Sequence, residues 1–266
     1  SIYLFYIYKK RIEHNRLKKL LYMKSNLEIY GIRTVIEAIK SQEKTIDKIF
    51  IQIGLKGGLI NELEALIRQK KIKSSYVPSQ KLNKLSKKNH QGVIARISPI
   101  KFYNLDEIIE RTEGKENKFI LILDQISDVR NFGAIIRTAE VAGVDAIIIQ
   151  NQSSAPITAD TVKTSAGAVF NVPICKVSHI KDAIYHLQSS KIKIIAASEK
   201  SDKNIYDISL KESIAIIMGS EEKGISPSII KLCDENVKLP MYGKIQSLNV
   251  SVACGVFLYE VIRQRI

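Results

Sequence analysis

The sequence predicts an α/β protein with two domains, a small α/β domain followed by a larger domain built on a mostly parallel sheet. Short apolar runs alternate with helical segments along most of the chain, which is the pattern of strands covered by helices. With 266 residues, of which 45% are hydrophobic and 26% charged, the chain is long and apolar enough for two cores. Most of the basic excess lies before residue 100, so the two regions also differ in charge.

The first domain is expected over residues 23–98, where short strands and helices alternate and lysines occupy the loops. We expect helices over residues 34–40, 59–70 and 80–87, and strands over residues 48–53, 75–77 and 93–97. Residues 1–22 are interpreted as an N-terminal extension, either a stretch upstream of a start at Met23 or a poorly ordered arm. Its apolar residues precede its basic ones, which is the reverse of a secretory signal.

Residues 99–117 are expected to be a linker that carries one short helix, 105–111. The second domain, residues 118–266, begins with the apolar strand 119–123. Further strands are expected over residues 146–149, 172–177, 192–197, 214–218 and 236–239, and helices over residues 133–142, 180–189, 227–232 and 248–265. Because ligands of parallel sheets bind at the carboxyl ends of the strands, the loops at those ends are candidate sites.

The net charge of +14 is unevenly distributed. Lys and Arg outnumber Asp and Glu by 15 to 6 over residues 23–100, but only by 16 to 15 over residues 119–266. This contrast indicates a polyanion-binding module attached to a catalytic module, although a composition that is rich in lysine everywhere is the alternative.

The sequence disfavours a disulfide-stabilised protein, a metalloprotein and an integral membrane protein. The three cysteines are widely spaced and form no CxxC pair, so we expect reduced core residues. The four histidines show no metal-ligand spacing, and no metal is expected. No apolar run approaches the ~20 residues of a membrane span, so we expect no integral membrane protein.

The loop after strand 119–123 carries the first candidate site residues. Asn131 stands at an expected helix N-cap, and Arg137 lies inside the following helix between apolar neighbours. A guanidinium on such a helix needs an anionic or carbonyl partner. An ion pair with Glu140, three residues further on, is the alternative, and the helix pattern favours neither.

Two more loops share this design. After strand 214–218, Gly219 and Gly224 bracket Glu221, and glycines there permit close backbone approach to a ligand, with a plain surface turn as the alternative. The chain has neither a GxxxxGK[ST] nor a GxGxxG loop, which disfavours nucleoside triphosphates and dinucleotides. After strand 236–239, a turn expected to leave no room for bulk at Gly243 leads to Ser247 and Asn249 at the mouth of the last helix.

Taken together, the three loops resemble the SpoU-type (TrmH-like) RNA ribose 2′-O-methyltransferases of the SPOUT superfamily over about residues 103–266. The resemblance rests on Asn131-x-Gly133-Ala134-x-x-Arg137-Thr138-Ala139, Met218-Gly219-Ser220-Glu221-x-x-Gly224, Leu239-Pro240-Met241 and Ser247-Leu248-Asn249-Val250-Ser251-Val252-Ala253. Val129 and Glu222 depart from the usual proline and glycine at positions without chemistry.

Two shorter motifs upstream are similar to the L30e-like substrate-binding domain of bacterial enzymes that modify a guanosine of large-subunit (23S) ribosomal RNA. These motifs are Tyr30-Gly31-Ile32-Arg33-x-Val35-x-Glu37-Ala38 and His90-Gln91-Gly92-Val93. The resemblance makes Arg33, His90, Lys87 and Lys88 the expected RNA contacts, with a structural role as the alternative for His90. Arg33 stands where the family more often has histidine, which leaves the choice of RNA open.

The family implies a SPOUT domain with a deep trefoil knot, an exception to the rule that chains are unknotted. It implies S-adenosylmethionine as methyl donor, held by Gly219, Leu239 and Leu248 with Met241 and Ser247 nearby. Arg137 is then expected to activate the ribose hydroxyl, with Asn131, Glu221 and Asn249 orienting it and the nucleotide.

The resemblance further implies a cytoplasmic homodimer joined through the knot domain, with ribosomal RNA as the preferred substrate. Transfer RNA is the alternative substrate. A non-catalytic ribosome-assembly factor is the alternative class, which the intact site residues disfavour.

Overall fold

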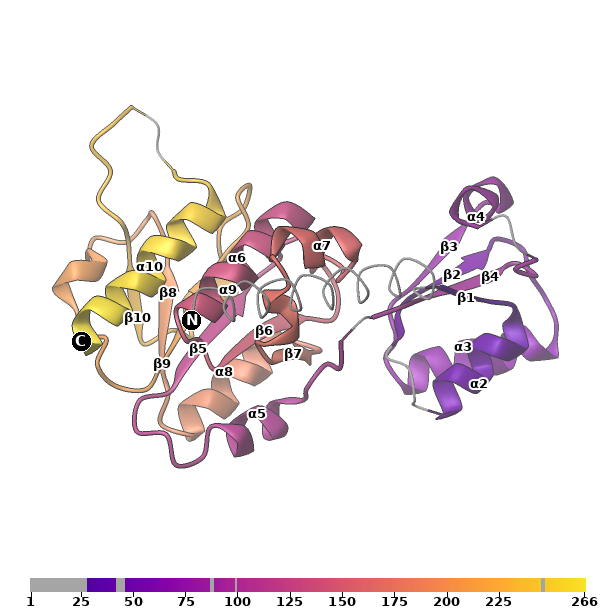
Figure 1. The fold of residues 1–266 in the computed structure, drawn as a ribbon, viewed down its shortest axis with the longest axis horizontal. Helices are drawn as coiled ribbons and strands as arrows, with labels where there is room; N and C mark the ends of the chain where they lie inside the picture. The colour runs from indigo at the N-terminus through magenta and orange to yellow at the C-terminus, as the bar shows by residue number, and fades with distance from the viewer. Residues whose placement is uncertain (1–27, 42–45, 87–88, 99, 245–246) are drawn as a thin grey trace, which may run out of the picture. The chain divides into compact units, whose positions relative to one another are not determined.

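The structure is a computed structural model that describes residues 28–41, 46–86, 89–98, 100–244 and 247–266 (Figure 1). The N-terminal extension, residues 1–22, and the two expected RNA contacts Lys87 and Lys88 lie outside these residues. The chain divides into two compact units. The first comprises the described residues up to Lys101 together with Ile157–Ala159, and the second comprises Phe102–Pro156 and Asp160–Ile266.

The first unit is built on a four-stranded sheet in the order β1-β4-β2-β3. Its elements are β1 (Glu28–Tyr30), α2 (Ile32–Ser41), β2 (Ile46–Gln52), α3 (Gly58–Gln69), β3 (Ser74–Val77), α4 (Ser79–Leu85) and β4 (Val93–Ile97). Strands β2 and β3 are parallel, and β4 is antiparallel to both β1 and β2. Apolar residues of α2 and α3 form a core with one face of the sheet, while Leu82 of α4 packs with Phe50 on the other face.

The second unit contains a six-stranded sheet in the order β10-β8-β9-β5-β6-β7, in which every pairing is parallel. The strands are β5 (Phe119–Leu123), β6 (Ala146–Gln150), β7 (Ile174–Val177), β8 (Lys193–Ala197), β9 (Ile214–Met218) and β10 (Glu235–Val237). All five residues of β5 and of β9 are buried, because both strands are central and covered on both faces. The predicted α/β class with a parallel sheet is confirmed.

The helices of this unit bury apolar side chains against the sheet. The elements are α5 (Leu105–Arg111), α6 (Val129–Val141), α7 (Ala159–Thr164), α8 (Ile180–Ser189), α9 (Pro227–Ile230), α10 (Val250–Arg265) and the short 3₁₀ helices η1 (Ala168–Phe170) and η2 (Ile205–Asp207). Residues of α5, α8 and α9 share one core with alternate residues of β5 and its neighbours. Helices α6 and α10 lie side by side (Figure 1). No helix among the described residues is long and apolar enough to cross a membrane.

Residues 102–117 lie within the second unit, although the sequence suggested a linker. The backbone of Tyr103 extends the edge of the sheet, because its N–H donates to Ile174 (2.9 Å) and its carbonyl accepts from Lys176 (3.1 Å). Asn104 then starts α5 with a capping box, in which its side chain and that of Glu107 each bond the other's backbone N–H (2.8 Å each). These bonds fix the segment to the sheet.

Helix α6 begins four residues before its predicted start. Asp128, and not Asn131, is its N-cap, since the Asp128 carboxylate accepts the Asn131 N–H at 2.7 Å. The prediction that Asn131 is the N-cap was therefore wrong. Asp128 and Asn131 are both residue types that cap helices, and the one that comes first in the chain caps this helix. Gly133 lies in the second turn, where a Cβ would fall 1.8 Å from the Thr164 hydroxyl oxygen, so α6 and α7 meet at this glycine.

The three cysteines are free thiols, and Cys175 and Cys254 are fully buried. Burial raises the pKa of each to about 12. Because the thiolate is the reactive form, about one thiol in 10⁴ is reactive at pH 8. We expect iodoacetamide at pH 8 to label the folded protein slowly and the urea-unfolded protein at three sites, as counted by mass spectrometry. Rapid labelling of the folded protein would contradict this assignment.

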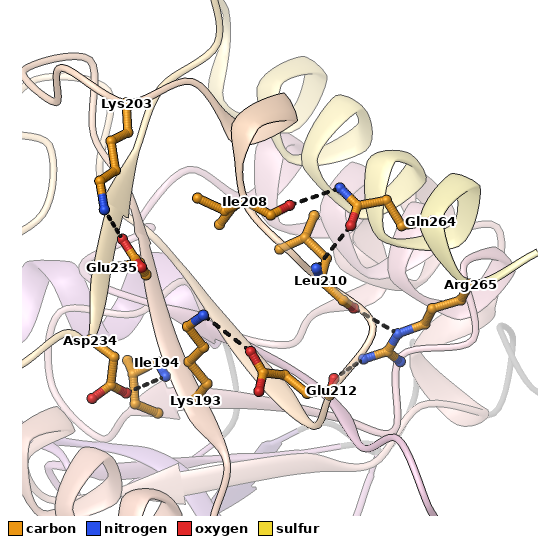
Figure 2. A network of polar contacts seen from close by, with 10 residues as sticks. All are labelled: Lys193, Ile194, Lys203, Ile208, Leu210, Glu212, Asp234, Glu235, Gln264 and Arg265. Carbon is orange, nitrogen blue, oxygen red and sulfur yellow. Dashed lines mark hydrogen bonds and ion pairs between the residues drawn. The ribbon is translucent and has the colours of Figure 1, made fainter.

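The last turn of α10 is fixed to the segment that connects β8 to β9 (Figure 2). Gln264 accepts from the Leu210 N–H (2.9 Å) and donates to the Ile208 carbonyl (3.1 Å). The Arg265 guanidinium donates to the carbonyls of Leu210 (3.0 Å) and Asn117 (3.1 Å), and reaches that of Glu212 as well. One planar guanidinium fork thus joins two segments, the one before β5 and the one before β9, to the end of the helix.

Arg265→Ala should lower the free energy of unfolding of the second unit by about 2–3 kcal/mol, because several charge-assisted hydrogen bonds are lost and the one to the Leu210 carbonyl is partly buried. Urea unfolding followed by circular dichroism measures this loss. Arg265→Lys is the matched variant, since it keeps the charge but lacks the fork. Wild-type stability of the lysine variant would show that charge alone, and not the fork, holds the helix end.

Candidate functional site

A cavity of about 280 Å³ opens where the carboxyl ends of β8, β9 and β10 meet the beginning of α10. Its wall includes residues 197–200 after β8, 218–224 after β9, and 238, 239 and 241 after β10. All five residues that the sequence proposed for the donor line it, namely Gly219, Leu239, Met241, Ser247 and Leu248. The lining is mixed, with Leu239, Leu248 and Phe257 beside serine hydroxyls and charged side chains.

The loop after β9 folds back on itself directly behind Gly219. Ser220 and Gly224 exchange two backbone hydrogen bonds of 2.8 and 3.2 Å. A Cβ on Gly219 would lie 2.1 Å from the Gly224 carbonyl carbon and 2.2 Å from the Ile225 nitrogen. Only glycine therefore fits this position without opening the loop, and its bare backbone forms part of the cavity wall.

Three of the predicted catalytic residues come together at the start of α10. Asn249 is the N-cap, and its Oδ1 accepts from the N–H groups of Ser251 (3.0 Å) and Val252 (3.3 Å). Its Nδ2 donates to Asn131 Oδ1 (3.0 Å) and to Glu221 Oε1 (2.6 Å). One amide group thus joins the first turn of α6 and the loop after β9 to the start of the last helix.

Glu221 also accepts the Val250 N–H at 3.3 Å, so its carboxylate lies at the positive end of α10. The predicted helix start at Leu248 was two residues early, because Ser247 and Leu248 lie in the loop and Asn249 caps. Gly243 was expected to leave no room for bulk, and this was wrong. No atom of the described residues lies within 4 Å of a Cβ built at this exposed position.

A second cavity, of about 320 Å³, lies on the other side of the loop after β9. The two cavities share residues 220–223 and Val250 as a common wall. The rest of the second cavity comes from the loops after β5 and β6 and the first turn of α6. The polar residues Gln125, Ser127, Asp128, Asn131 and Ser153 line it together with Ile126. Gln125 and Ser153 both adopt left-handed backbone conformations (φ 61° and 64°), which non-glycine residues rarely do.

A buried network that the sequence interpretation missed supports this second cavity. Asp124, which is 1% exposed, accepts the N–H (2.9 Å) and the hydroxyl (2.8 Å) of Ser226. Because the Ser226 hydroxyl proton is given to Asp124, its oxygen accepts from Gln125 Nε2 (3.1 Å). The network orients the Gln125 amide, and the only sequence signal was an aspartate directly after a buried strand.

Arg137 does not join the other three predicted catalytic residues. It lies six residues beyond Asn131 on α6, which corresponds to a rise of about 9 Å, and it lines neither cavity. Arg137 is exposed, and it has no hydrogen bond or ion pair within the described part of the chain. The alternative ion pair between Arg137 and Glu140 is absent from the described residues. The Glu140 carboxylate instead accepts a hydrogen bond from Asn171 Nδ2 (2.9 Å). The Arg137 guanidinium is therefore available to a ligand.

In the first unit the two short sequence motifs lie side by side. The Gly31 N–H donates to the Val93 carbonyl (3.1 Å), and Gly31 has a φ of 87°, which favours glycine. His90 uses both ring nitrogens within the chain, with Nε2 on Asn83 Oδ1 (2.9 Å) and Nδ1 accepting from Gly92 (3.0 Å). These bonds favour a structural role for His90. Arg33 is exposed in the first turn of α2.

A fully parallel sheet with polar loops enclosing two adjoining cavities at its carboxyl edge defines an α/β ligand-binding enzyme fold. Within the described residues, no group of three His, Cys, Asp or Glu side chains could hold a metal ion. A family model described as the SpoU rRNA Methylase family matches residues 118–259, and a model described as RNA 2′-O ribose methyltransferase substrate binding matches residues 29–103. The chain belongs to the SpoU family and is an RNA methyltransferase.

Relatives and solved structures agree with this assignment. A protein assigned to the TrmH family of tRNA/rRNA methyltransferases in Staphylococcus epidermidis is 35% identical over 241 residues, covering 90% of this chain and 96% of its own length. The SpoU methyltransferase AviRb of Streptomyces viridochromogenes, solved with AdoMet, has a TM-score of 0.57 at 21% identity and covers 90% of this chain and 89% of its own. The TrmH/SpoU tRNA modifying enzyme of A. aeolicus has a TM-score of 0.53 at 30% identity, covering 60% and 82%.

Proposed function

We propose that the protein transfers the methyl group of S-adenosylmethionine to a ribose 2′-hydroxyl of RNA, with the donor in the first cavity. The observation that carries this proposal is the Asn131–Asn249–Glu221 cluster, which joins the first turn of α6, the start of α10 and the loop after β9 beside the wall between two cavities. One cavity suits a donor and the other an acceptor, and the wall between them is where the two would meet. Two AdoMet-bound relatives of the same fold support the choice of donor.

The residues of the first cavity fit this donor. Gly219 presents bare backbone to the cavity, and the polar groups of a ligand can bond that backbone. Leu239, Leu248 and Phe257 offer apolar contact to an adenine ring, and Ser247 offers a hydroxyl to the sugar or the amino acid part. When bound, S-adenosylmethionine supplies an electrophilic methyl carbon.

The protein's part of the reaction is to align the attacking hydroxyl and to help it lose its proton. Asn131 and Glu221 would orient the ribose, since both side chains line the second cavity next to the shared wall. Asn249 holds these two side chains in place. Because a guanidinium is a fixed positive charge and a hydrogen-bond donor only, the role of Arg137 is to bind the phosphate next to the target ribose and to stabilise the developing alkoxide, with the proton passing to phosphate or water.

The acceptor nucleoside would occupy the second cavity. The polar side chains in its lining suit a base that has left its stack, because an unstacked base presents hydrogen-bonding edges. One carboxylate oxygen of Asp128 accepts the Asn131 N–H, and the other can accept from a ligand. Carboxylate acceptors of this kind match the N–H groups of guanine. We therefore favour a guanosine of large-subunit ribosomal RNA, with transfer RNA as the second candidate and the cytoplasm as the place of reaction.

We also propose a homodimer formed through α6 and α10. Val252, Val256 and Tyr259 form a stripe on α10 at helical spacing, and they are 54%, 37% and 51% exposed. Val141 of the adjacent α6 is 64% exposed. Exposed apolar stripes of this kind mark protein interfaces.

Val256→Glu should convert the dimer to a monomer, because it places a charge in the apolar stripe. Sedimentation equilibrium measures the mass of each variant. Tyr185→Glu on α8 is the matched control, since Tyr185 is 58% exposed on a different helix, and it should leave the mass unchanged. A monomeric wild-type protein at micromolar concentration would contradict the proposal.

The substrate is tested by mapping 2′-O-methyl sites in ribosomal and transfer RNA from cells with and without the gene. Loss of a guanosine methyl in large-subunit RNA is the expected result. Loss of a transfer RNA methyl would move the proposal to the second candidate. Unchanged methylation in both RNAs would overturn it.

A further inference from the structure

One face of the first unit's sheet carries a row of three cations, with the carboxylate of Glu28 in register at one end. In the strand register Arg96 of β4 lies directly opposite Lys48 of β2, and Glu28 of β1 lies on the other side of Arg96. Ile49 pairs with Ser74, so Lys73 lies beside Lys48, and its carbonyl accepts the Ile49 N–H. Arg96 thus lies in β4, Lys48 in the adjacent β2, and Lys73 directly before β3. Because neighbouring strands are about 4.8 Å apart, these three positive charges lie side by side.

The aromatic ring of Phe50 holds two of these cations on this face. Lys48 Nζ lies 5.1 Å from the ring centroid, and the Arg96 guanidinium carbon lies 5.5 Å from it. Phe50 itself is only 6% exposed, since it packs against Leu82 of α4. The ring therefore positions the cations and is not open to stack on a base.

The arrangement carries an electrostatic cost in the free protein. Like charges directly opposite each other in a sheet are destabilising. Burial lowers the pKa of Lys48, and the charges of Lys73, Arg96 and Lys81 lower it further, while that of Asp47 acts in the opposite sense. Glu28 flanks only Arg96, at the end of the row. Sequences keep such local conflicts mainly where a ligand resolves them.

We propose that this face, formed by Lys48, Lys73, Lys81 and Arg96, binds consecutive phosphates of the RNA backbone. The proposal rests on the RNA methyltransferase function and names a surface through which the first unit holds its substrate. Phosphates match the row because lysine and arginine neutralise them without reading sequence, and the buried ring leaves no stacking platform. The face would thus supply affinity and orientation and leave the choice of nucleotide to the second unit.

The test compares Lys48→Met/Arg96→Met with Lys70→Met/Lys71→Met in the full chain. Both pairs remove two charges, but Lys70 and Lys71 follow α3, which covers the opposite face. In-vitro transcribed large-subunit ribosomal RNA is the probe, with transfer RNA in parallel, and dissociation constants are measured over a range of salt. The first pair should reduce the slope of log K against log salt by about 1.4–1.8, and the control pair should leave it near wild type.

Two further readouts separate this proposal from failure of folding or of the proposed function. The melting temperature of Lys48→Met/Arg96→Met should equal or exceed that of the wild type, because the repulsion is relieved. S-adenosylmethionine affinity should be unchanged, because neither residue lines the donor cavity. An unchanged salt slope in the stable variant, or an equal change in the control pair, would overturn the phosphate-binding face and leave the methyl transfer proposal untouched.

Discussion

Arg137→Ala should lower the single-turnover rate of methyl transfer about 10²–10³-fold with donor and RNA both saturating. This is the loss expected when one preorganised group that stabilises developing negative charge is removed. The affinity for S-adenosylmethionine should stay within twofold of wild type, because Arg137 does not line the first cavity. Rapid quench with a radiolabelled methyl group measures the rate, and calorimetry measures donor binding.

Arg130→Ala is the matched control for this variant. Arg130 is also exposed on α6 and has the same charge, but it lies outside both cavities and outside the sequence motifs. Its rate should remain near wild type. Near-normal turnover of Arg137→Ala with saturating RNA would remove Arg137 from the reaction, and an equal loss in both variants would indicate a general effect of charge on RNA binding.

Gly219→Ala should weaken S-adenosylmethionine binding at least about 100-fold while the sheet stays folded. The added methyl group would lie 2.1 Å from the backbone of Gly224, so the Ser220–Gly224 turn must open and the cavity wall must move. Interactions that hold a ligand in fixed geometry are lost when their support shifts by about 1 Å. Calorimetry measures the affinity, and circular dichroism checks the fold.

Gly243→Ala, in the segment between β10 and α10, is the matched control. A Cβ there meets no atom of the described residues within 4 Å, so donor affinity should remain near wild type. Wild-type donor affinity in Gly219→Ala would place the donor elsewhere. Equal losses in both variants would indicate that any added methyl group disturbs the region, and would weaken the specific argument for Gly219.

The parts of the fold that the sequence predicted best are those with a strong local pattern. The apolar runs of β5 and β9 are buried strands, because burial leaves a direct signal in a few consecutive residues. The helix α7 and the three-residue strand β1 had no such pattern and were not anticipated. The trefoil knot and the dimer stay predictions from the resemblance.

The candidate site was predictable only in part, because its contacts join residues far apart in the sequence. The motifs identified Asn131, Glu221 and Asn249, yet their shared hydrogen bonds follow from the topology of the sheet. The link from Gln125 to Ser226 spans about a hundred residues and carries no local signal. The helix pattern likewise left two partners open for Arg137, and the structure removes one of them.

The central claim is that the two adjoining cavities bring a methyl donor to a ribose hydroxyl. The most direct measurement incubates the purified protein with S-adenosylmethionine bearing a deuterated methyl group and unmodified large-subunit ribosomal RNA, followed by nucleoside mass spectrometry. The account predicts a labelled methyl group on a single ribose, in 2′-O-methylguanosine. A labelled methyl group on a base, or none on any RNA despite donor binding, would contradict it.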